Sequence, residues 1–426
     1  MNKTRLFKKS LLAVTITTAT LASQQALAAG FQLNSQSATG LGRAFAGDAV
    51  IADNASVMSR NAAAMTLFDS HQFSGGVNII DTDIKVSDIK YKTGNIDSVT
   101  NSSSSPVPNI YYIHKLNEDL AIGAGIYSNF GTKNNFPTSF GVGTGSAGAG
   151  LPDASLFGGI TEIETINYTL NVAYRINEQW SLGGGIDVVQ GSGKLKRDAY
   201  SGVNALNIDA DGVGVGFNLG TVFELDSNNR FGLAYHYSPE VKASGTVYVD
   251  AGIATGNNAL IGQNAVAGQD VILPLPSMLE FSGYHRIEDT KFAVHYSLQW
   301  IGWDVFEKLE TSNNTTIKNY KWQDGYHLSL GGTYYLDDSW TLRAGYMHDT
   351  AAQDQLTSIS VPDSDRNWLS VGASYAFNNH HTVDFGFTYL MGKDVQVTEY
   401  AGTTPVLTAT THANAMLYGL QYSYSF

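Results

Sequence analysis

The chain has 426 residues, no cysteine and a net charge of −13, because 38 acidic residues outweigh 25 basic ones. The acidic excess argues against nucleic acid as a partner, since a phosphate backbone is bound by clustered positive charge. The absence of cysteine excludes a disulfide framework. A mean hydropathy of −0.11, with 44 glycines, 23 tyrosines and 19 phenylalanines, is typical of a membrane barrel, whose strands turn one face to lipid and the other to a polar interior.

Residues 1–28 have the pattern of an export signal. A basic stretch from Lys3 to Lys9 precedes an apolar core at residues 11–22, and Ala26-Leu27-Ala28 forms a cleavage site. The apolar core is shorter than the roughly 20 residues that a spanning helix needs. We therefore expect an exported protein whose mature chain begins at Ala29.

Residues 29–68 differ in composition and pattern from the segments before and after them. They are rich in glycine and alanine and do not alternate with a period of two. They are also too apolar for a solvated tail, which needs low hydrophobicity and high charge. Because the rest of the chain has the pattern of a barrel, we predict that this segment is an N-terminal hatch inside the lumen.

The remaining residues, 69–426, contain repeated segments in which apolar and polar side chains alternate. Such alternation is expected of strands that face lipid on one side and the lumen on the other. The last segment ends on an aromatic residue, which resembles the signal read by the outer-membrane barrel insertion machinery. Its outward face comprises Met416, Tyr418, Leu420, Tyr422, Tyr424 and Phe426, and similar alternation occurs at 213–220, 369–377 and 383–391.

Turn spacing predicts the orientation of the barrel. Outer-membrane barrels have short periplasmic turns, long extracellular loops and an even number of strands. The chain therefore predicts an all-β fold, a transmembrane antiparallel β-barrel of about fourteen strands in the outer membrane of a Gram-negative bacterium, surrounded by its lipid. Short polar turns lie at 117–119, 177–179, 226–229, 288–289, 337–338 and 378–381, and longer outer segments near 87–105, 131–161, 197–211, 245–270, 308–317, 349–366 and 394–412.

Specific residues then carry a family resemblance. The chain resembles the FadL-type long-chain fatty acid transporters of the outer membrane over nearly the whole mature length. One departure is Asn61-Ala62-Ala63, where the family usually has Asn-Pro-Ala, so the hatch turn is expected to be less rigid. The matching residues are Ala29-Gly30-Phe31-Gln32-Leu33-Asn34, Gly40-Leu41-Gly42-Arg43-Ala44, Ser59-Arg60-Asn61, Ser128-Asn129-Phe130-Gly131, Ala173-Tyr174-Arg175, Tyr334-Tyr335, Asp365-Arg366, Trp368-Leu369-Ser370 and Tyr375-Ala376-Phe377-Asn378.

The resemblance implies passive transport of a hydrophobic ligand. Family members are thought to capture an amphipathic ligand among the outer loops and to pass it to an apolar pocket. It then leaves sideways through the barrel wall, where the third strand kinks inward. The residues that match the kink here are Ser128, Asn129, Phe130 and Gly131, and those assigned to the hatch and its movement are Ala29, Gly30, Phe31, Asn61, Ala62 and Ala63.

Two basic residues match those that contact the ligand head group in the family. They are Arg197, at the outer end of the fifth strand, and Lys318, at the start of the tenth. A buried carboxylate needs a partner, and arginine can bind it through two nitrogens. An ordinary solvated charge is the alternative for each.

For capture of the ligand we single out the apolar residues of one outer loop, which could instead pack that loop as a lid: Phe136, Phe140, Leu151, Leu156, Phe157 and Ile160.

Enzyme activity and cofactors are not expected. Residues 143–148 match G-x-G-x-x-G by letter but lack the strand and helix of a nucleotide site, and no G-x-S-x-G or H-E-x-x-H sequence is present. Metal is not expected either. We therefore predict passive uptake of hydrophobic compounds, with long-chain fatty acids as the ligand. Uptake of aromatic hydrocarbons or other hydrophobic compounds by the same fold is one alternative, and a general porin is another.

Overall fold

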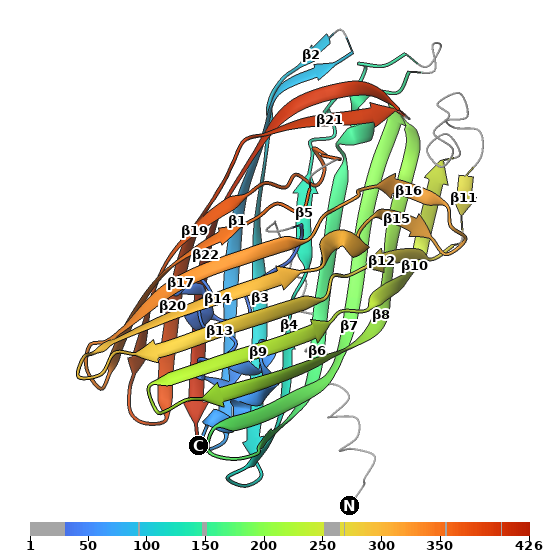
Figure 1. Ribbon diagram of the computed structural model, residues 1–426. Coiled ribbons are helices and arrows are strands. Elements are labelled where there is room, and N and C mark those ends of the chain that lie inside the picture. The colour runs from blue at the N-terminus through green and yellow to red at the C-terminus, as the bar shows by residue number, and fades with distance from the viewer. Residues whose placement is uncertain are drawn as a thin grey trace, which may run out of the picture.

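The computed structural model describes residues 30–92, 94–146, 151–250, 265–267, 269–353, 356–401 and 403–426. The expected export signal and Ala29 lie outside these residues. No helix in the described residues is long and apolar enough to cross a bilayer. The fold is a closed antiparallel β-barrel of 14 strands, which confirms the predicted class (Figure 1).

The barrel closes where the last strand pairs with the first. β1 (Gln72–Tyr91) runs antiparallel to β22 (Thr404–Ser425) on one side and to β3 (Val99–Lys115) on the other. We call each of the complete strands of the barrel wall a stave. Several staves are interrupted and comprise two shorter segments each. The remaining segments are β2 (Gly94–Ile96), β4 (Leu120–Tyr127), β5 (Gly131–Asn135), β6 (Ile160–Arg175), β7 (Trp180–Tyr200), β8 (Val203–Glu224), β9 (Asn229–Tyr237), β10 (Glu240–Asp250), β11 (Ala265–Ala267), β12 (Val271–Pro274), β13 (Met278–Arg286), β14 (Phe292–Ile301), β15 (Lys308–Thr311), β16 (Thr316–Asn319), β17 (Gly325–Tyr335), β18 (Trp340–Asp349), β19 (Arg366–Ala376), β20 (His381–Gly392) and β21 (Val395–Ala401).

Outward-facing apolar residues form a belt around the end of the barrel that carries the short turns. On β7 the side chains of Leu182 and Val188 are exposed, whereas further along the same face Lys194 is polar. On β8 the change falls between Val213, which is exposed, and Asp211. Lipid favours the apolar rows. This lipid belt therefore ends near these positions, and the rest of each strand rises above it.

The structure corrects the expectation of long irregular loops near 87–105, 197–211 and 394–412. These segments are largely strand, because β1, β7, β8 and β22 continue as hairpins far above the lipid belt (Figure 1). The outward residues of β1 there include Asp81, Asp83 and Lys85, while Ile80 and Ile84 face inward, so the alternation is the reverse of that of a lipid-facing strand. The segments near 131–161 and 349–366 do retain long irregular stretches, whereas the segment near 308–317 is mostly a hairpin, in which residues 312–315 join β15 to β16.

The N-terminal segment, residues 30–68, lies inside the barrel (Figure 1). Nearly all its side chains are buried, and its three short helices contact strands on opposite sides of the wall. Each helix begins with a side-chain cap: Ser37, Asn54 and Asn61 accept hydrogen bonds from backbone N–H groups of the first turn. These helices are α2 (Ala38–Leu41), η1 (Ala55–Ser59) and η2 (Ala62–Leu67).

Two wall glycines let the turn at residues 61–63 approach the sheet. A Cβ on Gly183 would lie 2.3 Å from the nitrogen of Ala63, and one on Gly220 would lie 2.0 Å from Oδ1 of Asn61. Asn61 in turn donates from Nδ2 to the carbonyl of Ala49 at 2.8 Å and to that of Thr221 at 3.0 Å. The side chain of Asn61 therefore joins the N-terminal segment to β8.

Candidate functional site

The third stave of the barrel is interrupted between Tyr127 and Gly131. β4 ends at Tyr127 and β5 begins at Gly131, and residues 128–130 between them leave the ladder. The N-terminal segment pairs with this break: the N–H of Gly131 donates to the carbonyl of Phe31 at 2.8 Å, and that of Leu33 donates to the carbonyl of Asn129 at 2.7 Å. The break is thus held by residues at the very start of the described chain.

A gap in backbone pairing lies beside the break. β3 pairs with β4 only over Ile110–Lys115, and β5 pairs with β6 on its other side. In the described residues no ladder joins the outer part of β3 to β5. Instead the Nδ2 of Asn101 on β3 donates to Oδ1 of Asn134 on β5 at 2.7 Å. We call this stretch, between residues 99–109 of β3 and residues 131–135 of β5, the wall gap.

Aromatic rings surround Phe31 where it meets the break. Its ring centroid lies 4.6 Å from that of Trp303, 5.3 Å from Phe306, 5.6 Å from Trp322 and 6.3 Å from Phe130. Trp303 begins η6 (Trp303–Val305), which follows β14, and Trp322 lies between β16 and β17. All five side chains are buried. The rings therefore form an aromatic cluster around the beginning of the N-terminal segment.

Arg197 lies above the lipid belt with its side chain buried, only 7% exposed. Its guanidinium donates to the carbonyls of Ile160 and Lys196 and to Oγ1 of Thr161, all of them uncharged acceptors. No carboxylate within 4.0 Å pairs with it in the described part of the chain. Burial lowers the pKa of Arg197 to about 10, against a smaller raising effect of Tyr320 and Glu399. The guanidinium is thus a buried cation held by neutral groups.

Lys318 lies in the same outer region but has an acidic partner. Its Nζ is 3.3 Å from Oε2 of Glu399 and donates to Oγ of Ser358 at 2.7 Å. Glu399 itself is buried, and its other oxygen accepts from the backbone N–H of Ile359 at 2.9 Å. Burial lowers the pKa of Lys318, Glu399 raises it and the nearby charge of Arg197 lowers it further. The two predicted cations therefore lie within electrostatic reach of each other.

Tyr320 joins these cations to the aromatic cluster. The Nζ of Lys318 lies 5.7 Å from the Tyr320 ring centroid, and that ring lies 4.7 Å from Phe306 and 5.7 Å from Trp322. Apolar side chains of β7, β8 and β16 pack in the same buried cluster as these rings. The site thus has two cations at one end and a wall of aromatic and aliphatic groups leading from them toward Phe31.

The outer loop after β5 packs mostly inward. Phe136, Phe140 and Phe157 are buried against the tall parts of β1, β21 and β22, together with Ile359. Leu151, in contrast, is 39% exposed. Leu156 and Ile160 are partly buried. The loop, with its short helix η4 (Ala154–Phe157), therefore covers the outer mouth and leaves part of its apolar surface accessible.

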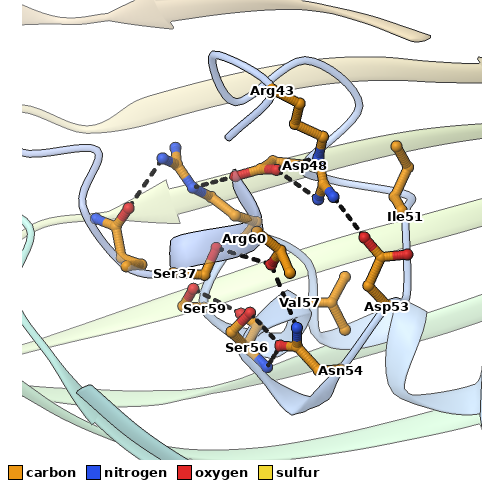
Figure 2. A pocket seen from close by; sticks show the side chains of 12 residues that line it. Ser37, Arg43, Asp48, Ile51, Asp53, Asn54, Ser56, Val57, Ser59 and Arg60 are labelled. Carbon is orange, nitrogen blue, oxygen red and sulfur yellow. Dashed lines mark hydrogen bonds and ion pairs between the residues drawn. The ribbon is translucent and has the colours of Figure 1, made fainter. Parts of the chain in front are cut away.

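Ion pairs hold the N-terminal segment together beneath this site (Figure 2). Arg43 lies 2.7 Å from Asp48 and 2.6 Å from Asp53, and Arg60 lies 3.8 Å from Asp48. They line a cavity of about 10 Å³, room for about one water molecule. Asp53 also pairs with Arg343 of β18 at 3.1 Å, so the network reaches the barrel wall.

Comparison with known proteins identifies the family to which this architecture belongs. Residues 19–426 match the family described as outer membrane protein transport protein (OMPP1/FadL/TodX). The chain is 34% identical over 467 residues to the long-chain fatty acid transport protein of Escherichia coli K12, with all of both chains covered. It is also 34% identical over 483 residues to outer membrane protein P1 of Haemophilus influenzae, with 99% of each covered.

The chain belongs to this family. It is therefore an outer-membrane transport protein rather than an enzyme, and the resemblance drawn from its sequence is confirmed.

Solved structures of the family share the fold. The crystal structure of a Pseudomonas aeruginosa FadL homologue superposes with a TM-score of 0.81 at 21% identity, covering 93% of this chain and 100% of that one. The Pseudomonas putida toluene transporter TodX superposes with a TM-score of 0.61 at 17% identity, covering 87% and 94%. At these identities the likeness concerns the architecture alone.

Within this family member, sequence reasoning missed several residues of the site. Glu399 comes from a strand far along the chain, and no local pattern marked it as the partner of Lys318. Asn101 and Asn134, which bridge the wall gap, were missed for the same reason. Trp303 and Trp322 carried a signal that could have been used, because aromatic residues are concentrated at 300–306 and 320–322, above the lipid belt.

Proposed function

We propose that this chain carries long-chain fatty acids passively across the outer membrane, with Arg197 and Lys318 binding the carboxylate. Two relatives at 34% identity support the ligand class, because the Escherichia coli and Salmonella typhi proteins are named long-chain fatty acid transport proteins. The observation that carries the proposal is the buried guanidinium of Arg197, whose hydrogen-bond acceptors in the described residues are all neutral. A buried charge without a counter-ion is costly. A ligand carboxylate would supply that counter-ion.

Lys318 would complete the head-group site by exchange. The carboxylate of Glu399 is paired with Lys318, and it also accepts hydrogen bonds from the hydroxyl of Ser358 and the backbone N–H of Ile359. Glu399 therefore keeps partners of its own if Lys318 turns toward a bound fatty acid. The acyl chain would then lie along the apolar residues of the buried cluster that includes Tyr320.

The route we propose runs from the outer loop to the wall gap. Leu151 and the partly buried Leu156 and Ile160 would take the ligand first, and movement of Gly30 and Phe31 would release the aromatic cluster. The ligand would leave sideways past the break at residues 128–131. In this scheme residues 29–68 act as the hatch. No nucleotide site is involved, so transport runs down the gradient of the ligand.

Aromatic hydrocarbons are a second candidate ligand. The ring of Phe31 is itself surrounded by four rings at 4.6–6.3 Å. Aromatic rings pack well against one another in such edge-to-face arrangements. If the N-terminal segment moved, a single-ring hydrocarbon would fit the same surroundings without needing either cation.

Binding measurements separate the two candidates. The purified barrel would be titrated with palmitate and with toluene, as wild type and as the double variant Arg197→Ala/Lys318→Ala. We expect the double variant to bind palmitate about 10- to 100-fold more weakly, since hydrogen bonds to charged groups contribute about 1.5–3 kcal/mol, and to bind toluene as before. Lys196→Ala, which alters a neighbouring outward-facing lysine, serves as the control. Equal loss of both ligands would contradict the assignment of the head-group site.

A further inference from the structure

The wall gap is lined on its inner side by polar side chains that lack partners. Asn101 and Asn134 meet across it, so both face inward. Residues an even number of positions away on a strand share the same face. Ser105 and Asn109 on β3 therefore point the same way as Asn101, and Thr132 on β5 the same way as Asn134. All are at least nine-tenths buried.

Several of these side chains have no hydrogen-bond partner in the described structure. The atoms without a hydrogen-bond partner are Oγ of Ser105, Oγ1 of Thr132, and both Oδ1 and Nδ2 of Asn109. Buried polar groups are nearly always paired, because an unmade hydrogen bond costs free energy. Four such atoms spaced along one gap in the wall, on both of its sides, therefore indicate a path along which something polar is bound.

The chemistry of these groups differs from that of the outer site. Arg197 and Lys318 offer only positive donors, which suit an ionised carboxylate. Ser105, Thr132 and Asn109 are uncharged, and between them they offer both donors and acceptors. A protonated carboxylic acid has one donor and one acceptor, so it matches this second set.

We propose that Ser105, Asn109 and Thr132, spaced along the wall gap, provide successive uncharged hydrogen-bonding positions for the protonated carboxyl end of a fatty acid as its chain enters the lipid. The inference rests on the sideways exit proposed above. An ionised carboxylate is strongly disfavoured in hydrocarbon, so a fatty acid must take a proton from water before it crosses into the bilayer. The wall gap would hold it at that point. A ligand without a head group gains nothing from these side chains.

The test compares two ligands with the same chain, palmitic acid and hexadecane. The protein, reconstituted in vesicles, would be loaded with each labelled ligand, and transfer from protein to bilayer would be timed. In the triple variant Ser105→Ala/Asn109→Leu/Thr132→Val we expect palmitic acid to transfer at least about tenfold more slowly, because each lost hydrogen bond raises the barrier to transfer. Hexadecane should transfer as fast as before or faster. Binding of palmitate at Arg197 and Lys318 should stay within about twofold.

Controls separate a damaged barrel from a lost site. Ser102→Ala/Ser104→Ala removes two hydroxyls that face outward on the same strand, and it should leave both transfer rates unchanged. The infrared band of palmitate labelled with ¹³C at the carboxyl should show a protonated population in wild type that the triple variant lacks. Unchanged palmitic acid transfer, or equal slowing of both ligands, would overturn the proposal.

A second variant tests the sideways exit by itself. Asn101→Cys/Asn134→Cys places the only cysteines of the chain on the two sides of the wall gap, where a short bis-maleimide can join them. If cross-linking slows both ligands, the exit stands, and the triple variant then decides the head-group site. If cross-linking changes neither ligand, the exit itself is wrong, and the uncharged site is overturned with it.

Discussion

The N–H of Gly131 donates to the carbonyl of Phe31 at 2.8 Å, so the beginning of the N-terminal segment substitutes for a strand where the wall breaks. Together with the bond from the N–H of Leu33 to the carbonyl of Asn129 at 2.7 Å, it joins the residues nearest the start of the described chain to the third stave of the barrel. Movement of Phe31 therefore changes two things together, the aromatic cluster around its ring and the backbone pairing of the break.

Gly30→Ala should loosen this contact. Gly30 has φ +69°, which costs an alanine roughly 1–2 kcal/mol, and its Cβ would lie 2.5 Å from the Trp322 ring and 2.7 Å from that of Trp303. We expect the two indoles to become more accessible, with a red shift of tryptophan emission and stronger quenching by acrylamide. Gly332→Ala, whose Cβ would meet nothing nearer than 3.7 Å, is the control. Identical spectra for the two variants would contradict this role of Gly30.

Arg343→Met should loosen the N-terminal segment from the wall. The change leaves the carboxylate of Asp53 with Arg43 alone and removes the ion pair to β18. Removing one partner of a buried pair typically costs about 3–5 kcal/mol, and partial exposure of Asp53 reduces that figure. We expect the variant to show a higher ion conductance than wild type in planar bilayers.

The control for that conductance is an exposed ion pair elsewhere. Lys393→Met breaks the pair with Asp365 at 2.9 Å, in which the side chains are 58% and 37% exposed. Such pairs contribute about 0–1 kcal/mol, so conductance should not change. A large conductance in the wild-type protein would favour a general porin instead.

Ala62→Pro should stabilise the turn in which this chain departs from the usual family sequence. Ala62 is the first residue of η2, a position where proline loses no helical hydrogen bond. We expect a gain of about 0.4–1 kcal/mol and slower amide hydrogen exchange over residues 61–67. Ala64→Pro should do the opposite, because the N–H of Ala64 donates to the carbonyl of Asn61 at 3.1 Å. Faster exchange in Ala62→Pro would show that the turn does not accept the fixed φ.

Palmitate affinity should fall at alkaline pH. Burial lowers the pKa of Arg197 to about 10 and that of Lys318 below its usual value. A bound carboxylate favours the protonated cations, so binding is complete below these pKa values and is lost as pH rises through them. We expect constant affinity from about pH 6.5 to 8 and a decline of up to tenfold per pH unit for each cation that deprotonates. Toluene binding, measured over the same range, should not change.

Sequence patterns predicted the part of the fold that lipid constrains. Where β7 and β8 cross the membrane, each outward position must be apolar, so Leu182 and Val213 belong to alternating rows that can be read directly. Above the lipid belt both faces meet water or protein, and the tall hairpins carry residues such as Asp83 and Lys85 that resemble a loop. The missed strands follow from that loss of constraint.

The site was predictable only where a residue matched the family. Arg197 and Lys318 were proposed in this way, and the fold brings them to one region. Glu399 lies 81 residues from Lys318 in the sequence, and its role depends on a pairing between distant strands. The wall gap is likewise a property of register: β3 stops pairing with β4 above Ile110, which no local pattern reports.

The height of the hairpins decides where the protein meets its ligand. β22 spans 22 residues, roughly 70 Å along the strand at about 3.3 Å per residue, while about 9–11 tilted residues suffice to cross the hydrocarbon layer. More than half of such a strand therefore lies beyond the hydrocarbon layer, on the outer side. In the proposed scheme, a hydrophobic ligand admitted at the outer mouth would cover that height inside the barrel, and it would reach the membrane only at the level of the wall gap.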